Sequence, residues 1–405
     1  MTTEPLAEKA RHLLDANARR GKGYYYTAPS PKKYPHQWSW DSSFHAIVNC
    51  RLGRPNLARE EILTLLQNMS PEGVLPHIIF HGRGLRNLTE QLLRSYWPRP
   101  GRSPLVQPPV AALAVKEIWE STEDSTFLHE ALPFLERHFN WLEASRRFGR
   151  SPLVSIISPW ESGLDHKPVF DEVLGRVVNL PLGRYIALYT MELRLARHKY
   201  DSKEVLKRGY FNVREVLFNT IYALGMDALG EMLKATGELS KADLFRNRGR
   251  DVGKAILEEC YDNATGLYYD IDVNNNSFIG QPSISSLMPL ALSNVPRSRL
   301  EAMIRHLTDT SEFWLPFPVP SVPRNGRHFE PQNQRYLWRG PTWINTNWLL
   351  VNGLKKHGYP ELADAIAESS RKLVAQSGFR EYYNPLTGEG GGEKDFGWST
   401  LAAIM

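Results

Sequence analysis

Apolar residues recur along most of the chain at the three- and four-residue spacing of a single helix face. The alternation typical of strands is rare, and the segment 267–271 is the clearest strand candidate. We expect helices over the ranges 5–20, 42–52, 56–69, 106–120, 126–146, 183–199, 213–237, 241–260, 283–292, 297–309, 342–357 and 359–376. The pattern therefore predicts an all-α protein.

These helices continue along 405 residues without a linker, a low-complexity stretch or a block of like charge. They also lack the short fixed period of a solenoid. A closed toroid of paired inner and outer helices satisfies both observations, so we predict a single domain over 1–405. Long irregular segments are candidates for function, and two of them, 71–105 and 311–341, are predicted loop insertions. The others are 21–41, 150–182 and 377–398.

Composition excludes several classes of protein. With 42% hydrophobic and 23% charged residues the chain is not disordered, and no apolar run is long enough to cross a bilayer. The first residues lack the apolar stretch of a secretory signal. Two cysteines, Cys50 and Cys260, cannot form a disulfide framework. We therefore expect a cytoplasmic protein that does not bind membranes.

The net charge of +5 is spread over the sequence, unlike the concentrated basic stripe of a nucleic-acid-binding protein. Eleven tryptophans are more unusual, and many stand beside Gly, Pro, Asp or Glu. Such residues favour a sugar pocket, because aromatic rings pack on the C–H faces of pyranoses. An aromatic-rich core explains the composition equally well, and composition alone leaves both interpretations open.

A first motif, HQWSWD (36–41), precedes a predicted helix. Asp41 fits an N-cap of that helix. Alternatively, its carboxylate accepts hydrogen bonds from sugar hydroxyls while Trp38 or Trp40 covers the ring.

A second motif, SPWESGLD (158–165), places Glu161 and Asp165 four residues apart in a segment with poor helical character. A general acid needs a carboxyl whose pKa is raised by apolar neighbours or by a second carboxylate, and this motif supplies both. A solvated turn is the alternative.

Two further segments combine aromatic residues with turns. In EYYNPLTGEGGGEKDFGWS (381–399), Glu381 is predicted to lie where a helix gives way to a loop, and adjacent glycines let the backbone approach a ligand. In YLWRGPTWINTNW (336–348), Trp343 and Trp348 also fit the core of a helix. A short QPP sequence at 107–109 offers an amide at a helix entry.

Other chemistries find no support. The chain has no HExxH motif, no paired Cys/His spacing, no EF-hand-like loop, no GxSxG elbow and no GxGxxG after a strand. We predict no metal and no cofactor.

Together these segments resemble glycoside hydrolase family 63, a group of inverting glycosidases built on an (α/α)6 barrel. The likeness rests on QWSWDSSFH, QPPV, SPWESGLDHKP, YLWRGPTWINTNWLL and EYYNPLTGEGGGEKDFGWS, in the same order over roughly residues 24–400. It is closest to the short bacterial members that cleave mannosylglycerate or glucosylglycerate. Family 37 trehalases are more distantly similar.

The resemblance implies that Asp165 is the general acid and that Glu381 is the general base. Glu161 is an alternative acid, and Glu393 is an alternative base. Subsite −1 would be formed by Trp40, Asp41 and Gln107, and the other expected substrate-binding residues are Tyr34, Trp160, Glu161, Gly163, Trp338, Gly340, Trp343, Tyr382, Glu393 and Trp398. In an inverting enzyme the two carboxyls oppose each other across the sugar, about 6.5–9.5 Å apart. A closed toroid brings together such distant positions.

The partner implied is a small α-glucoside or α-mannoside. Candidates for binding its aglycone are Lys33, Tyr34, Tyr96, Trp97, Arg86, Arg94, Arg99 and Arg102. The segment 80–104 is rich in arginine and more basic than we expect of glycerate-specific enzymes, so an aglycone other than glycerate remains open. The alternative is that these arginines belong to a solvated loop without a binding role. Alternatives for the function are a trehalase-like enzyme, phosphorolysis or epimerisation, and a non-catalytic sugar-binding barrel. The sequence does not decide between glucose and mannose in subsite −1. It also leaves open whether the protein forms a homo-oligomer.

Overall fold

The computed structural model describes residues 4–81, 95–175, 178, 182–333 and 335–405. Within them the fold is mainly helical, which confirms the all-α prediction. The α-helices are α1 (Glu4–Asn17), α2 (Ser39–Arg51), α3 (Pro55–Gln67), α5 (Ala111–Thr122), α6 (Ser125–Arg146), α7 (Phe170–Leu174), α8 (Gly183–Arg197), α9 (Ser202–Arg208), α10 (Val216–Ala235), α11 (Leu239–Glu259), α12 (Arg297–Thr308), α13 (Ile344–Lys356) and α14 (Pro360–Ser377). Three 3₁₀ helices are η1 (Pro159–Ser162), η3 (Ile284–Ala291) and η4 (Gly397–Ala403).

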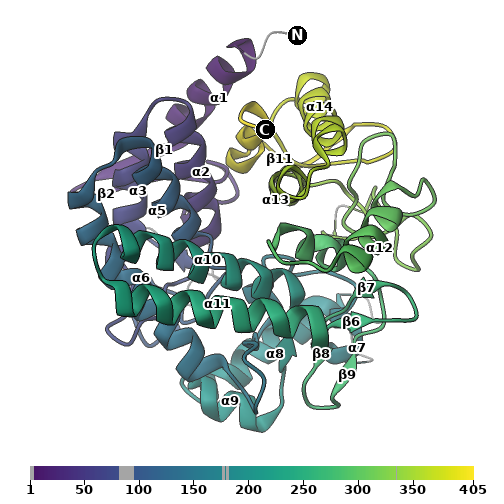
Figure 1. The fold of residues 1–405 in the computed structure, drawn as a ribbon, viewed down its shortest axis with the longest axis horizontal. Helices are drawn as coiled ribbons and strands as arrows, with labels where there is room; N and C mark the ends of the chain where they lie inside the picture. The colour runs from purple at the N-terminus through teal and green to yellow at the C-terminus, as the bar shows by residue number, and fades with distance from the viewer. Residues whose placement is uncertain (1–3, 82–94, 176–177, 179–181, 334) are drawn as a thin grey trace.

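Within the described residues, six helix pairs form a ring (Figure 1). Each pair has an inner and an outer member, and the pairs are η4 with α1, α2 with α3, α5 with α6, α10 with α11, η3 with α12, and α13 with α14. The inner members contact one another in the order α2, α5, α10, η3, α13 and η4, and η4 returns to α2. This arrangement is the (α/α)6 toroid that the sequence predicted.

Burial explains which helix of a pair is inner. Inner helix α2 buries 12 of its 13 residues, because neighbours surround it. Outer helix α11 buries 7 of its 21, and these residues follow the spacing of one apolar stripe.

The ring is closed by contacts between the two ends of the chain, which lie side by side in Figure 1. The amide of Gly397, at the start of η4, donates to the Pro29 carbonyl at 2.8 Å. The side chain of Asn17, the last residue of α1, donates to the Asp395 carbonyl at 2.8 Å. These bonds seat η4 between α13 and α2.

Strands are short and sit in the connections. They are β1 (Ala18–Gly21), β2 (Tyr24–Thr27), β3 (Gln37–Trp38), β4 (Ile78–Ile79), β5 (Val213–Arg214), β6 (Tyr261–Asp262), β7 (Leu267–Tyr268), β8 (Ile271–Asp272), β9 (Ser277–Phe278), β10 (Arg380–Tyr383) and β11 (Gly390–Lys394). All described pairings are antiparallel, in the orders β1-β2, β3-β4, β5-β8-β9, β6-β7 and β10-β11.

Some local predictions differ from the structure. The strand expected over 267–271 is divided into two short strands, of which β7 pairs with β6 while β8 pairs with β5 and β9. The helix expected over 283–292 is the 3₁₀ helix η3, and Pro289 inside it cannot donate the bond that an α-helix needs. The helix expected from 106 begins only at Ala111, after the two prolines. Helices α7 and α9 were not predicted, because they are too short for a periodic pattern.

No helix among the described residues is both long and apolar enough to span a membrane.

Candidate active site

A cavity collects side chains from α2, β10, η4 and the long connections. It encloses about 450 Å³ of empty space, part of which is open to solvent. Its lining consists of Pro29, Tyr34, Trp38, Trp40, Asp41, Gln107, Gly163, Asp165, Leu337, Trp338, Trp343, Glu381, Phe396 and Trp398. Ten of these residues were expected at the site from the sequence. Pro29, Leu337 and Phe396 were not, and Trp38 was named only as one of two rings in the first motif that could cover a sugar.

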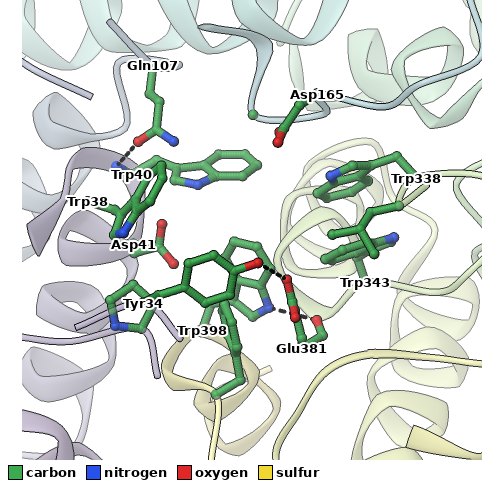
Figure 2. Close-up of a pocket in the computed structure, with 14 residues that line it drawn as sticks. Tyr34, Trp38, Trp40, Asp41, Gln107, Asp165, Trp338, Trp343, Glu381 and Trp398 are labelled. Carbon is green, nitrogen blue, oxygen red and sulfur yellow. Dashed lines mark hydrogen bonds between the residues drawn. The ribbon is translucent and has the colours of Figure 1, made fainter. Parts of the chain in front are cut away.

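Two carboxyl groups face the cavity from opposite sides in Figure 2, Asp165 above and Glu381 below. Asp165 lies on the turn that follows η1, and Glu381 lies on β10. The expectation that Glu381 marks the end of a helix was therefore wrong. It stands in the β10–β11 hairpin, where the register shifts between Arg380 and Tyr382. Such an irregularity re-aims a side chain.

Burial is the main cause that raises the pKa of Asp165 to about 6. The negative charge of Glu381 raises it further, while a backbone hydrogen bond and the Lys33 ammonium oppose the shift. A carboxyl with this pKa retains its proton at mildly acidic pH and can donate it to a leaving group.

The carboxylate of Glu381 is held by two hydrogen bonds. The Tyr34 hydroxyl donates to Oε1 at 3.1 Å, and the Glu393 amide donates to Oε2 at 3.0 Å. Burial raises the pKa of Glu381, and Lys33 together with these two bonds opposes the shift because each favours the ionised form. The group is thus arranged to accept a proton.

Gly392 makes room for this carboxylate. Its φ of +63° is in the left-handed region, and a Cβ there would collide with Oε2 of Glu381. A glycine therefore satisfies both the backbone conformation and the close approach.

Asp41 is buried in the first turn of α2, with 3% of its surface exposed. The N-cap interpretation was wrong, because Trp38 occupies the N-cap position and no side chain caps the helix. Burial raises the pKa of Asp41 to about 7, although His45 opposes the shift. Among the described residues its Oδ1 has no hydrogen-bond partner, so this oxygen is available to a sugar hydroxyl.

Tryptophan rings form the walls of the cavity. Trp338 and Trp343 stack with centroids 3.7 Å apart, and Trp40 meets Trp398 edge-on at 5.6 Å. Gly163, at a φ of +73°, lies directly against the Trp40 ring, where any side chain would collide. The Trp40 amide in turn donates to the Gln107 side chain at 3.2 Å. These flat apolar faces suit the C–H surface of a sugar ring.

Five expected site residues do not line the cavity. The most informative is Glu161, which is fully buried in an ion pair with Arg146 and accepts hydrogen bonds from the amides of Val106 and Ile157. Its acceptor positions are thus occupied within the protein. The others are Trp160 beside Tyr189, Gly340 against Phe329 and Pro331, Tyr382 against Trp343, and Glu393, whose amide rather than side chain reaches Glu381.

The expected aglycone-binding residues are scattered. Tyr34 lines the cavity, and Lys33 lies 5.1 Å from the centroid of its ring. Tyr96, Trp97, Arg99 and Arg102 are not in the lining. Arg86 and Arg94 lie outside the described residues.

Two buried arginines beside the turn of Asp165 were not predicted. Arg184, on α8, and Arg339 are 2% and 4% exposed, and both form ion pairs with Asp171. Both guanidinium groups lie over the ring of Tyr336, which also contacts His166. Arg339 stands in the fourth sequence motif, but nothing in the sequence marks Arg184. Among the described residues, two cations against one carboxylate leave a surplus positive charge.

Within the described parts of the chain, no group of three or more His, Cys, Asp or Glu side chains is placed to hold a metal ion.

Comparisons with known proteins identify the family of this chain. Residues 34–399 match the mannosylglycerate hydrolase MGH1-like glycoside hydrolase domain. Mannosylglycerate hydrolase from Thermus thermophilus is 30% identical over 98% of this chain and 99% of its own length. Glucosylglycerate hydrolase from Mycolicibacterium hassiacum is 27% identical over 100% of this chain and 98% of its own.

Among solved structures, a family 63 mannosylglycerate hydrolase from Thermus thermophilus, in complex with Tris and D-glycerate, superposes with a TM-score of 0.88. It is 30% identical, and the match covers 99% of both chains. The family model covers residues 34–399, and the matches to the Thermus thermophilus enzyme cover nearly all of both chains. This chain therefore belongs to the MGH1-like hydrolases of glycoside hydrolase family 63, and it is an inverting glycoside hydrolase.

Proposed function

We propose that this enzyme hydrolyses an α-glycoside of glycerate, with mannose or glucose in subsite −1, and that Asp165 is the general acid and Glu381 the general base. The observation that carries this proposal is the placement of these two carboxyls on opposite sides of one tryptophan-walled cavity (Figure 2). An inverting hydrolase needs one carboxyl to protonate the leaving oxygen and another to activate water on the opposite face.

Their surroundings support these roles. Asp165, whose pKa is raised to about 6, accepts no hydrogen bond from another side chain in the described structure that would hold it ionised. Glu381 receives two hydrogen bonds that favour its ionised form. Neither Glu161 nor Glu393 lines the cavity, so both alternatives are disfavoured.

The surplus charge at Arg184 and Arg339 supports an anionic aglycone. A buried cation without a full counter-charge is unfavourable, and a bound carboxylate would supply that charge. Both guanidinium groups lie over the ring of Tyr336, which contacts His166, the residue after Asp165. The pair therefore stands near the proposed acid, although neither arginine is in the cavity lining. Guanidinium groups bind carboxylates through paired hydrogen bonds. Glycerate has the required charge, and relatives of this chain act on its mannoside and glucoside.

Proton NMR of the products tests the proposal. Wild-type enzyme is incubated with mannosylglycerate, glucosylglycerate, trehalose and kojibiose, and the first anomer released is recorded. We expect β-mannose or β-glucose to be released early from a glycerate glycoside. Release of the α-anomer first would contradict the acid and base roles, and preferential cleavage of trehalose would contradict the glycerate aglycone.

Matched variants test the residues. We expect Asp165→Asn and Glu381→Gln each to remove turnover while folding is retained. Glu393→Gln is the control, because this half-buried side chain does not line the cavity, and it should stay active. A fully active Asp165→Asn enzyme would contradict the assignment.

We also propose that the whole chain is one catalytic domain and that the enzyme acts in the cytoplasm.

A further inference from the structure

The turn that carries Asp165 ends at a fully buried lysine. The amide of Lys167 donates to the Leu164 carbonyl at 2.8 Å, so Asp165 and His166 are the two central residues of that turn. The Lys167 side chain is 1% exposed and is not part of the cavity lining. It therefore points away from the substrate and into the protein.

Three side chains from separate segments hold its ammonium group. Asp270 Oδ2 lies at 2.6 Å and the Ser285 hydroxyl at 3.0 Å, and Glu215 Oε1 is in direct contact. Glu215 immediately precedes α10, and Ser285 belongs to η3. Both of these helices are members of the inner ring.

The anchoring groups are themselves fixed. Glu215 accepts a hydrogen bond from the Phe218 amide at 2.5 Å, which caps α10, and another from Ser285 at 2.6 Å. Asp270 Oδ1 accepts from the Val216 amide at 2.9 Å. The position of Lys167 is therefore set by the start of α10 and by η3, and through the backbone it sets the position of the turn.

A buried charge cluster is a poor source of stability, because desolvation offsets much of the attraction between its members. The Lys167 ammonium is held in three fixed directions, by hydrogen bonds to Glu215 and Ser285 and by an ion pair with Asp270. This arrangement has another consequence, which is to orient the residues next to Lys167. We propose that Lys167 is a positioning residue, which holds the turn so that the Asp165 carboxyl faces the glycosidic oxygen. This proposal rests on the function of Asp165 proposed above.

The proposal predicts a selective defect. General acid catalysis contributes roughly 10²–10⁴-fold, and a displacement of about 1 Å can cost about 10²-fold. That cost applies only to a leaving group that must be protonated. With a glycosyl fluoride the C–F bond breaks and fluoride leaves as the anion. A water oxygen forms the new bond to carbon, and the base accepts the water proton.

The experiment compares Lys167→Met with wild type on a glycerate glycoside and on the α-fluoride of the same sugar. We expect kcat to fall by about 100-fold on the glycoside and by less than about 10-fold on the fluoride, because water activation by Glu381 is intact. A purely structural role would lower both rates by the same factor. Equal losses on both substrates, or no loss on either, would overturn the proposal.

Asp165→Ala separates this proposal from the one on which it depends. It should show the same selective retention of fluoride hydrolysis. If Asp165→Ala loses both activities, the general acid assignment itself is wrong. If Asp165→Ala is selective and Lys167→Met is not, only the positioning role of Lys167 is wrong.

Two further variants cover the case in which Lys167→Met does not fold. Lys167→Met with Asp270→Asn removes the lysine and one of the carboxylates that would be left unpaired. Ser285→Ala keeps the lysine and removes only the hydroxyl, with its hydrogen bonds to the ammonium and to Glu215. Both should show the same substrate selectivity, and the loss in Ser285→Ala should be the smaller.

Arg214→Met is the matched control, because Arg214 is a buried cation next to Glu215. It forms an ion pair with Glu259 and donates to the Phe148 carbonyl instead. Thermal melting measures the stability of each variant, and the rates on the glycoside and the fluoride measure its selectivity. Arg214→Met should lose stability but lower both rates equally. A selective loss on the glycoside in this control would overturn the proposal.

Discussion

The hydroxyl of Tyr34 donates a 3.1 Å hydrogen bond to Oε1 of Glu381 and joins residues 347 positions apart in the chain. Tyr34 belongs to the connection before β3, and Glu381 belongs to β10, so this bond crosses the junction where the ring closes. It ties the proposed base to the segment that directly precedes the first sequence motif.

Removal of this bond should impair the base. In Tyr34→Phe the ionised form of Glu381 loses a donor, so its pKa rises and the acidic limb of the pH–rate profile moves to higher pH. We expect kcat to fall by about 10-fold or more, since a hydrogen bond to a charged group contributes about 1.5–3 kcal/mol. Tyr26→Phe, which loses a bond to the Pro35 carbonyl, is the control and should leave the acidic limb in place.

A methyl group at Gly392 should displace the same carboxylate. Gly392→Ala places a Cβ against Oε2 of Glu381, and we expect kcat to fall by about 100-fold, on glycoside and fluoride alike. Gly358→Ala has a similar positive φ of +76° with open space around the new Cβ. It should therefore share the backbone strain but keep its activity. If both variants lost activity equally, backbone strain rather than the displaced carboxylate would explain the loss in Gly392→Ala.

The charge of Lys33 should set the position of the pH optimum. Lys33 lowers the pKa of both Asp165 and Glu381, so in Lys33→Met both values rise. Activity requires a protonated Asp165, so it falls as pH rises through about 6. It also requires an ionised Glu381, so it falls again when low pH protonates that group. Both limbs of the profile should therefore move to higher pH. Lys22→Met, at another exposed lysine, should leave them unchanged.

The surplus cation should determine affinity for a charged aglycone. Arg184→Met leaves Asp171 paired with Arg339, so the cluster becomes neutral without an unpaired carboxylate. We expect KM for the glycerate glycoside to rise about 10–100-fold, while KM for the uncharged methyl glycoside changes little. Arg194→Met is the control on the exposed face of α8. A similar rise in KM for both substrates would contradict a carboxylate subsite.

Glu192 should make stability depend on pH. It is 4% exposed on α8, and burial raises its pKa from 4.5 to about 8, although a hydrogen bond from Tyr200 opposes the shift. Between these values the folded state binds one more proton than the unfolded state, so this group makes the free energy of unfolding fall by about 1.4 kcal/mol per pH unit as pH rises.

Chemical denaturation between pH 5 and pH 8 measures this contribution. In Glu192→Gln the decline that Glu192 causes should disappear, so the variant gains stability relative to wild type as pH rises. Glu258→Gln, at an exposed position on α11, should follow the wild-type slope. Parallel curves for wild type and Glu192→Gln would contradict the shifted pKa.

Local sequence determined the helices and the aromatic motifs. The helix predicted over 241–260 is α11 at Leu239–Glu259, because its apolar residues repeat with the period of one helix face. The strand β10 was misread, since four residues before an Asn-Pro turn carry too little pattern to separate a strand from a helix end.

Only the tertiary structure decided which carboxyls face the cavity. Glu161 and Asp165 are close in sequence, yet the first is buried against Arg146 and the second lines the cavity. Glu381 and Glu393 lie in one hairpin, and only Glu381 lines the cavity. The orientation of each group depends on contacts with distant segments, such as Tyr34 with Glu381 and Lys167 with Asp270. Local periodicity records which face of a helix is buried, but it carries no information about which remote segment covers that face when the ring closes.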